Sequence, residues 1–138
     1  MANNLQLDKR DGGRILIDAL ARNGVRIDAA FWALSGSTWR LIIVSPTVES
    51  KGPKFVLLEI SKELEKANGT AGFELFDIDV TGPQTPEIFD LLRLHPMLIN
   101  GTNITLINVQ TNDRIIEGLH SYFFNRNLLI DDSNSLSS

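Results

Sequence analysis

The chain has 138 residues, of which 43% are hydrophobic and 22% are charged, and its formal net charge at pH 7 is −4. This length suits a single domain, and this composition excludes a wholly disordered chain. Cysteine is absent, which excludes disulfides, thiolate metal sites and cysteine nucleophiles. The 13 basic residues are scattered along the chain, so we do not expect nucleic acid as a partner.

The N-terminal segment lacks the apolar stretch of a signal peptide, and no apolar run is long enough to span a membrane. We therefore expect a cytoplasmic protein with no membrane partner. Residues 1–8 are polar, and the last eight residues are acidic and rich in serine. Such segments cannot bury enough apolar surface to fold. We expect one domain at 9–125, with disordered tails at 1–8 and 126–138.

The first predicted element is a helix over residues 9–22, because apolar residues recur there at helical spacing before an Asn-Gly pair. A β-hairpin follows, with strands at 26–34 and 38–44 around a Ser-Gly-Ser turn. One strand contains Trp32 and the other contains Trp39. Both faces of the first strand are apolar, which predicts a central strand that is covered on both sides.

A second long helix is predicted over 53–67, since Pro53 suits the first helical position and Gly69 favours a left-handed helix end. A third strand is expected at about 72–80. A helix that connects two strands of one sheet allows those strands to be parallel. The sheet is therefore expected to be mixed.

The rest of the chain predicts a short helix from Thr85 to Leu94 and a second hairpin with strands at 104–109 and 114–124. The residue before Pro96 avoids helical geometry, which ends the short helix. The expected fold class is α+β, with the element order α-β-β-α-β-α-β-β. About five strands form a mixed, largely antiparallel sheet with two longer helices and one short helix.

Two carboxylates are candidates for catalysis or metal binding. Asp77 and Asp79 are two apart in the predicted third strand, so they share one face and can share a cation or a proton. Phe73 and Leu75 precede them on that face, and the alternative interpretation is a strand end that enters water. A metal site needs a third ligand, which the sequence does not identify.

His120 lies between Leu119 and Ser121 in an apolar strand. One interpretation is a buried histidine bonded to the backbone, and the other is a member of a catalytic pair with a serine. The sequence contains no Gly-x-Ser-x-Gly elbow that supports such a pair. The buried histidine is the favoured interpretation.

Glu49-Ser50-Lys51 resembles a fragment of the PD-(D/E)xK nuclease signature. In that family the carboxylate and the lysine project from a strand toward a metal-bound water. Here the triplet follows Pro46, beyond the predicted strand, and Asp28 would have to be the preceding metal ligand. The resemblance therefore places Glu49 and Lys51 among the candidate residues without defining a complete site.

The hairpin segments Ala29-Ala30-Phe31-Trp32 and Trp39–Pro46, followed by Lys51-Gly52-Pro53, resemble a small family of uncharacterised bacterial proteins. The resemblance covers roughly residues 14–65, and a weaker similarity is found around residues 118–122. It implies a bacterial, cytoplasmic source. It implies no activity, since none is assigned to that family.

The leading functional hypothesis is a non-enzymatic module that binds a partner protein or itself, with no cofactor and no metal. A homodimer joined through the terminal hairpin is expected, because Phe123 and Phe124 lie near the end of that hairpin.

Two other classes of function are weighed against it. The first is a metal-dependent hydrolase or nuclease-like enzyme, whose candidate residues are Asp77, Asp79, Glu49, Lys51 and His120. The second is a nucleic-acid accessory protein, which requires a basic stripe. The arginines that such a stripe would use are Arg10, Arg14, Arg22 and Arg26.

Overall fold

The computed structural model describes residues 5–126 and residue 128. The strands are β1 (Ala29–Ser35), β2 (Thr38–Val44), β3 (Ile78–Thr81), β4 (Ile104–Gln110) and β5 (Ile115–Phe124). The helices are α1 (Leu7–Arg22), α2 (Thr47–Lys51), α3 (Pro53–Ala67), α4 (Pro86–Leu94) and α5 (Met97–Asn100), with a 3-10 turn η1 (Leu75–Asp77).

The strands form one mixed sheet in the order β3-β2-β1-β5-β4. β2 and β3 are parallel, and the other neighbouring pairs are antiparallel. The parallel pair arises because α2 and α3 connect β2 to β3 and return the chain to the same end of the sheet. The structure thus confirms the predicted α+β class and the mixed five-stranded sheet.

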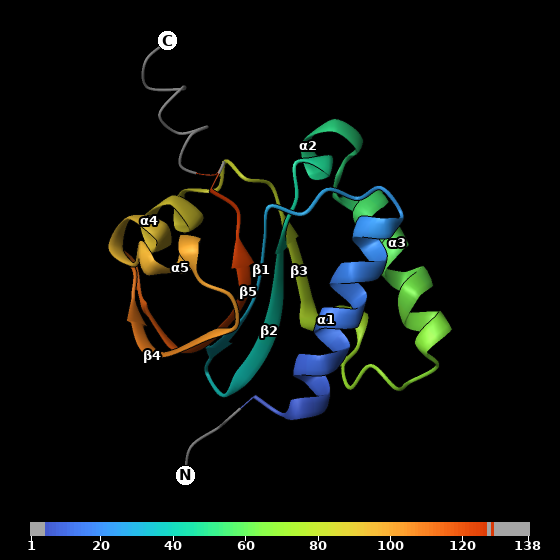
Figure 1. The fold of residues 1–138 in the computed structure, drawn as a ribbon, viewed down its shortest axis with the longest axis horizontal. Coiled ribbons are helices and arrows are strands. Elements are labelled where there is room, and N and C mark those ends of the chain that lie inside the picture. The colour runs from blue at the N-terminus through green and yellow to red at the C-terminus, as the bar shows by residue number, and fades with distance from the viewer. Residues whose placement is uncertain (1–4, 127, 129–138) are drawn as a thin grey trace.

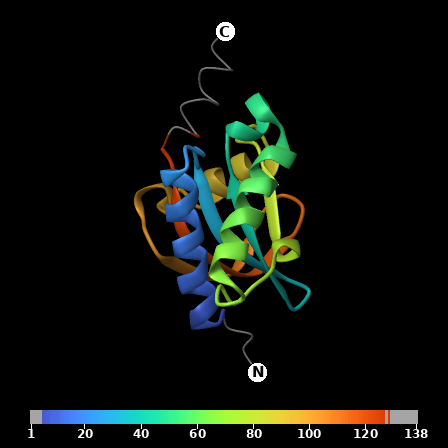
Figure 2. The ribbon, with the colours of Figure 1, turned by 90° about the vertical axis from the view of Figure 1, so that its right-hand side faces the viewer.

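Helices cover both faces of the sheet (Figure 1). α1 and α3 lie side by side on one face, and α4 and α5 lie on the other (Figures 1 and 2). β1 is the middle strand and sends alternate side chains to the two cores, with Trp32 on the α1 side and Phe31 on the α4 side. The prediction of a central strand that is covered on both faces is confirmed.

Local signals account for the ends of α3. Pro53 occupies its first turn, where the missing N–H costs no hydrogen bond, and Gly52 before it has a φ of 86°. The helix ends where Asn68, with a φ of 50°, adopts the left-handed conformation. Val56 and Ile60 are the buried residues of this helix. Its bounds match the prediction.

The predicted strand at 72–80 is wrong over most of its length, because β3 begins only at Ile78. Gly72 has a φ of 86° and lies close to the backbone of α1 at Asp8. The next residues form η1, in which the side chains of Glu74 and Asp77 accept hydrogen bonds from each other's backbone N–H groups. Tertiary packing and this local capping together replace the first part of the strand.

The structured part of the chain extends beyond the predicted limits at both ends. α1 begins at Leu7 rather than at residue 9. Leu128 is buried in the core on the α4 side, although it lies in the predicted C-terminal tail. Residues 1–4, 127 and 129–138 lie outside the described part of the chain. The short helices α2 and α5 were not predicted.

Candidate binding surface

His120 lies on β5, in register with Trp32 of β1 on one side and Thr105 of β4 on the other. Only 2% of its surface is exposed. Its Nδ1 shares a hydrogen bond of 2.9 Å with Oγ1 of Thr105, and the donor depends on the tautomer. Its Nε2 is buried and has no hydrogen-bond partner among the described residues. The histidine is buried as expected, but its bond is to a side chain rather than to the backbone.

The surroundings of His120 disfavour its charged form. Burial lowers the pKa of this imidazole from 6.5 to about 4, and the positive charges of Arg10 and Arg14 act in the same direction. His120 is therefore neutral at pH 7. The two arginines lie close enough to act on it, which shows that α1 brings positive charge to this part of the sheet.

A buried chain of hydrogen bonds joins α1 to the sheet. The Tyr122 hydroxyl accepts a hydrogen bond of 2.9 Å from Nε1 of Trp32 and donates one of 2.5 Å to the carbonyl oxygen of Arg10. Burial raises the pKa of Tyr122 to about 12, so the phenol stays protonated and can donate. Gly13 allows this approach, because a Cβ there would lie 2.3 Å from the tyrosine oxygen.

Tyr122 occupies an irregular position in β5. Ala30 of β1 is in register with Phe123, but the next residue, Phe31, is in register with Ser121. Tyr122 is therefore the extra residue of a β-bulge, a feature that re-aims a side chain. The bulge places the tyrosine in the core under α1.

Arg10 and Arg14 are four residues apart in α1 and lie on the side of this helix that faces β5. The guanidinium carbon of Arg14 lies 5.0 Å from the centre of the Tyr122 ring, and its Nη2 donates a hydrogen bond of 3.3 Å to Oδ1 of Asn103. Both arginines are half-buried. Neither forms an ion pair with a carboxylate among the described residues. Each arginine therefore lacks a direct ion pair, although Asp18 lines a groove with Arg14 and the charge of Asp11 acts on Tyr122.

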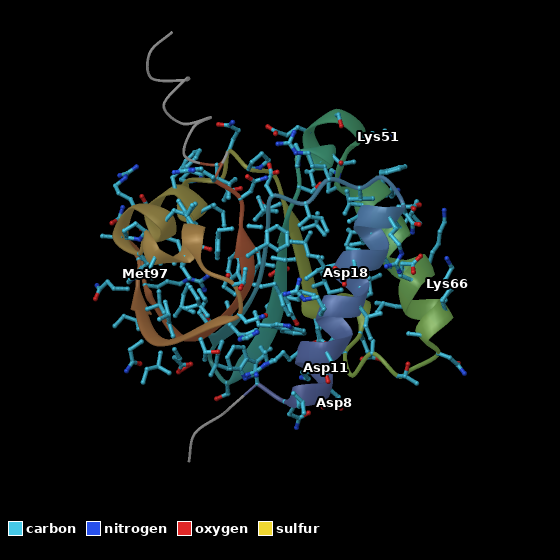
Figure 3. All side chains as sticks on the ribbon, viewed as in Figure 1. Asp8, Asp11, Asp18, Lys51, Lys66 and Met97 are labelled. Carbon is cyan, nitrogen blue, oxygen red and sulfur yellow. The ribbon has the colours of Figure 1, made fainter. Side chains whose placement is uncertain are left out.

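The opposite side of α1 is acidic. Asp8 and Asp11 line a groove between α1 and α3 with a cavity volume of about 190 Å³, and Glu63 lines it from α3. Figure 3 labels both aspartates on α1, and both line the groove toward α3. In the first half of the helix, the basic flank with Arg10 and Arg14 faces β5 and the flank with Asp8 and Asp11 faces α3. In the second half the signs are mixed, because Asp18 lines a groove with Arg14 and Arg22 lies toward α3.

The four arginines considered as a basic stripe do not lie together. Besides the two that face β5, Arg22 lies toward α3, where the pKa of Glu63 is lowered mainly by a hydrogen bond from Lys66 and in smaller part by the charge of Arg22. Arg26 forms an ion pair of 3.1 Å with the buried Asp28. Arg14 lines a groove with Arg26, but of these two only Arg14 lacks a carboxylate partner within 4.0 Å among the described residues, as Arg10 does.

β4 forms one outer edge of the sheet, and no other described strand pairs with its outer side. It has seven residues and no charged side chain. Ile107 at its centre is 77% exposed. The other outer strand, β3, has only four residues and carries Asp79 in an ion pair with Arg40. The two edges of the sheet therefore differ in length and in charge.

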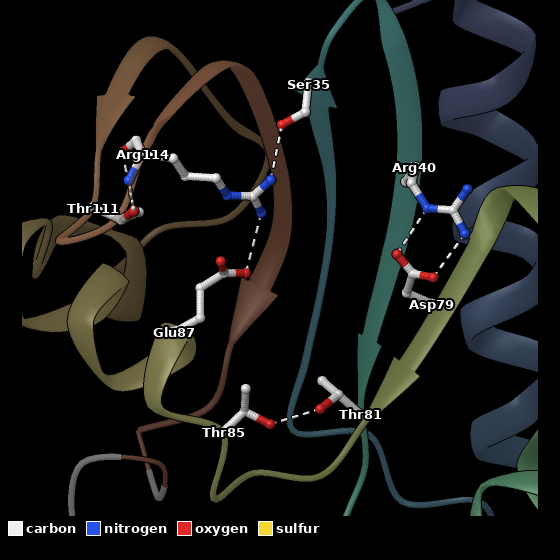
Figure 4. Close-up of polar contacts among 8 residues, drawn as sticks. All are labelled: Ser35, Arg40, Asp79, Thr81, Thr85, Glu87, Thr111 and Arg114. Atoms are coloured by element: carbon white, nitrogen blue, oxygen red, sulfur yellow. Dashed lines mark hydrogen bonds and ion pairs between the residues drawn. The ribbon is translucent and has the colours of Figure 1, made fainter.

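The structure does not bring Asp77 and Asp79 together on one strand. Asp77 belongs to η1, where its Oδ2 accepts a hydrogen bond of 2.9 Å from the backbone N–H of Glu74. Asp79 lies on β3 and accepts two hydrogen bonds from Arg40, of 2.8 and 2.7 Å (Figure 4). These bonds lower the pKa of Asp79. The prediction that the two carboxylates share one strand face is wrong.

The remaining predicted residues also lie apart. Glu49 and Lys51 belong to the helix α2 rather than to a strand, and Nζ of Lys51 lies 4.7 Å from the centre of the Phe55 ring. Asp79 and His120 lie on β3 and β5, three strand spacings or about 14 Å apart. Among the described residues, no group of three or more His, Asp or Glu side chains is placed to hold a metal ion.

Replacing Asp79 with Asn is expected to lower the free energy of unfolding at pH 7 by no more than about 1 kcal/mol, because the ion pair with Arg40 is exposed. The lowered pKa means that the contribution is present above the unfolded-state pKa and is lost as the pH falls through the folded-state pKa. Urea denaturation measures both effects. Asp113→Asn, at an exposed site in the β4–β5 turn, is the control, and an equal response in that variant would contradict the expectation.

The basic flank of α1 was missed as a site because its parts are far apart in the sequence. Arg10 and Arg14 are separated from their neighbours Asn103 and Tyr122 by about ninety residues or more. The one available signal was the spacing of four residues, which places both arginines on one side of a helix. The bulge at Tyr122 leaves no recognisable pattern.

No family model matches the chain, and neither does any curated protein or solved structure. In the described part of the chain, no helix has both the length and the apolar character needed to cross a membrane.

Proposed function

We propose that this protein is a non-enzymatic interaction module that associates with a second copy of itself through β4. The observation that carries the proposal is the uncharged outer strand, whose central Ile107 is 77% exposed. An unpaired strand edge presents a row of backbone donors and acceptors to any extended segment. Burying Ile107 adds apolar contact to those hydrogen bonds.

The composition of β4 suits pairing with itself. A two-fold contact brings the same strand against its own copy, so that any charge on the strand would meet a like charge. β4 carries none. Asn108 has a φ of 51°, which interrupts the regular strand, so we place the contact on Ile104–Ile107.

This proposal keeps the terminal hairpin as the contact but replaces the residues that form it. Phe124 is only 2% exposed and stacks on Phe31 with ring centres 5.0 Å apart, so it cannot meet a partner. Phe123 is partly buried against the core on the α1 side. The exposed apolar residues of the hairpin are instead Ile107 and Ile115, which is 53% exposed.

Sedimentation over a range of protein concentrations tests the proposal. Wild-type protein is expected to move from monomer to dimer as its concentration rises, and Ile107→Lys is expected to remain a monomer. In a dimer of this variant, the lysines of the two copies would lie close together across the two-fold axis and repel each other. Leu58→Lys, which alters a 57% exposed residue on α3, is the matched control and is expected to dimerise like wild type. A wild-type monomer at every concentration would overturn the proposal, as would equal loss of dimer in both variants.

A further inference from the structure

We propose that Arg10 and Arg14 form a binding site for a carboxylate or phosphate group at the junction of α1 with β4 and β5. This site does not depend on association through β4. It is supported by the lack of a direct ion pair at either arginine among the described residues, by the contacts that hold Arg14 and the backbone at Arg10, and by buried polar atoms that lack partners among the described residues.

The two arginines differ from four of the other arginines in the described part of the chain. Four arginines have a carboxylate oxygen within 4.0 Å, namely Arg26, Arg40, Arg93 and Arg114. Arg114, for example, contacts both Glu87 and Ser35 (Figure 4). Arg10 and Arg14 have no such partner among the described residues. Side chains four apart on a helix are neighbours, so one anion can contact both guanidinium groups.

Contacts within the protein hold the Arg14 side chain and the backbone at Arg10 before any ligand arrives. Tyr122 holds the backbone of α1 through the carbonyl oxygen of Arg10, and its ring lies beneath the guanidinium of Arg14. Asn103 accepts a hydrogen bond from Arg14 on the β4 side. A site whose groups are already oriented loses less conformational entropy on binding.

Two buried nitrogen atoms at this junction lack hydrogen-bond partners among the described residues: Nε of Arg10 and Nε2 of His120. Buried polar atoms are usually paired, and an unpaired one is costly. The His120 side chain is almost fully buried, with 2% of its surface exposed, and both arginine charges act on it. A bound anion would oppose those charges, so the His120 pKa should rise when the site is filled.

The ligand class follows from the chemistry of the guanidinium group. Its planar fork of N–H donors matches the two oxygens of a carboxylate or of a phosphate. A carboxylate would come from an acidic side chain of a protein partner, whereas a phosphate would come from a phosphorylated ligand. Two probes separate these sources: inorganic phosphate and acetate, each titrated at constant ionic strength against chloride.

NMR of the arginine Nε–Hε groups and of the His120 ring measures binding directly. In the wild type, the signals of Arg10 and Arg14 are expected to shift saturably with at least one probe, and the His120 pKa is expected to rise. Arg14→Gln should weaken binding by about tenfold or more, since it removes charge-assisted hydrogen bonds. Arg22→Gln, which removes the same charge from the other side of α1, should bind like wild type.

The two probes give distinct supporting outcomes. Saturation by phosphate alone assigns a phosphate site, and saturation by acetate as well assigns a carboxylate site. If Arg14→Gln fails to fold, Arg14→Lys keeps the charge without the planar fork and should still bind more weakly than wild type. The absence of saturation with either probe would overturn the proposal, and so would equal weakening by Arg22→Gln. Ile107→Lys should retain binding, which separates this result from the test of dimerisation.

Discussion

Lowering the pH from 7 to 4 is expected to reduce the free energy of unfolding of the wild type by about 3 kcal/mol more than that of His120→Asn. The reason is the buried imidazole, whose pKa is lowered from 6.5 to about 4 by burial and by Arg10 and Arg14. The unfolded state takes up a proton as the pH falls below 6.5, while the folded state stays neutral until about pH 4. Stability is therefore unaffected above that range and falls within it.

The comparison with His120→Asn isolates the histidine, because the carboxylates titrate in both proteins and cancel in the difference. The asparagine amide can replace Nδ1 in the hydrogen bond to Thr105. Urea denaturation at several pH values provides the free energies. Parallel pH profiles for the two proteins would show that His120 is not held neutral by its surroundings.

Replacing Gly13 with Ala is expected to lower the free energy of unfolding by about 2 to 3 kcal/mol, through overpacking beneath α1. The expected change in the free energy of unfolding is opposite in sign to that in an ordinary helix interior, where replacing Gly with Ala stabilises by about 1 kcal/mol. A Cβ at Gly13 would lie 2.3 Å from the hydroxyl oxygen of Tyr122 and 3.1 Å from Nε1 of Trp32. Both partners are fully buried and have no room to withdraw.

A double-mutant cycle with Tyr122→Phe tests this cause. Removing the hydroxyl group relieves the closest contact, so Gly13→Ala should cost at least about 1 kcal/mol less in the Tyr122→Phe background than in the wild type. Ala21→Gly, at an exposed position of the same helix, should show the ordinary loss of about 1 kcal/mol. Thermal or urea denaturation measures the free energy of unfolding of the wild type, the two single variants and the double variant. A stabilising effect of Gly13→Ala would contradict the close approach of α1 to the sheet.

Local sequence signals determined the elements whose ends and faces depend on neighbouring residues. Pro53 and Gly69, which has a φ of 82° directly after the left-handed Asn68, mark the two ends of α3. α4 begins at Pro86, one residue after the predicted start at Thr85. The apolar residues on both faces of β1 identified the central strand. These predictions succeeded because proline, left-handed turns and side-chain alternation act within a few residues.

The tertiary structure alone decided where β3 begins and which polar residues meet. Packing of Gly72 against α1 and the capping of η1 by Asp77 shorten the strand, and that change places Asp77 and Asp79 in different elements. The two carboxylates therefore do not share a strand face, although the charges of both raise the pKa of Arg40.

Tertiary packing also forms the basic flank of α1. The helical spacing of Arg10 and Arg14 can be read from the sequence, but their neighbours His120 and Tyr122 come from the other end of the chain. A β-bulge, whose position no local pattern reveals, turns Tyr122 toward α1. The sequence by itself therefore determined the α+β sheet and its central strand. Only long-range packing decided that two arginines without carboxylate partners among the described residues, and a neutral histidine, share one surface, because the contacts that place them join residues about ninety or more positions apart.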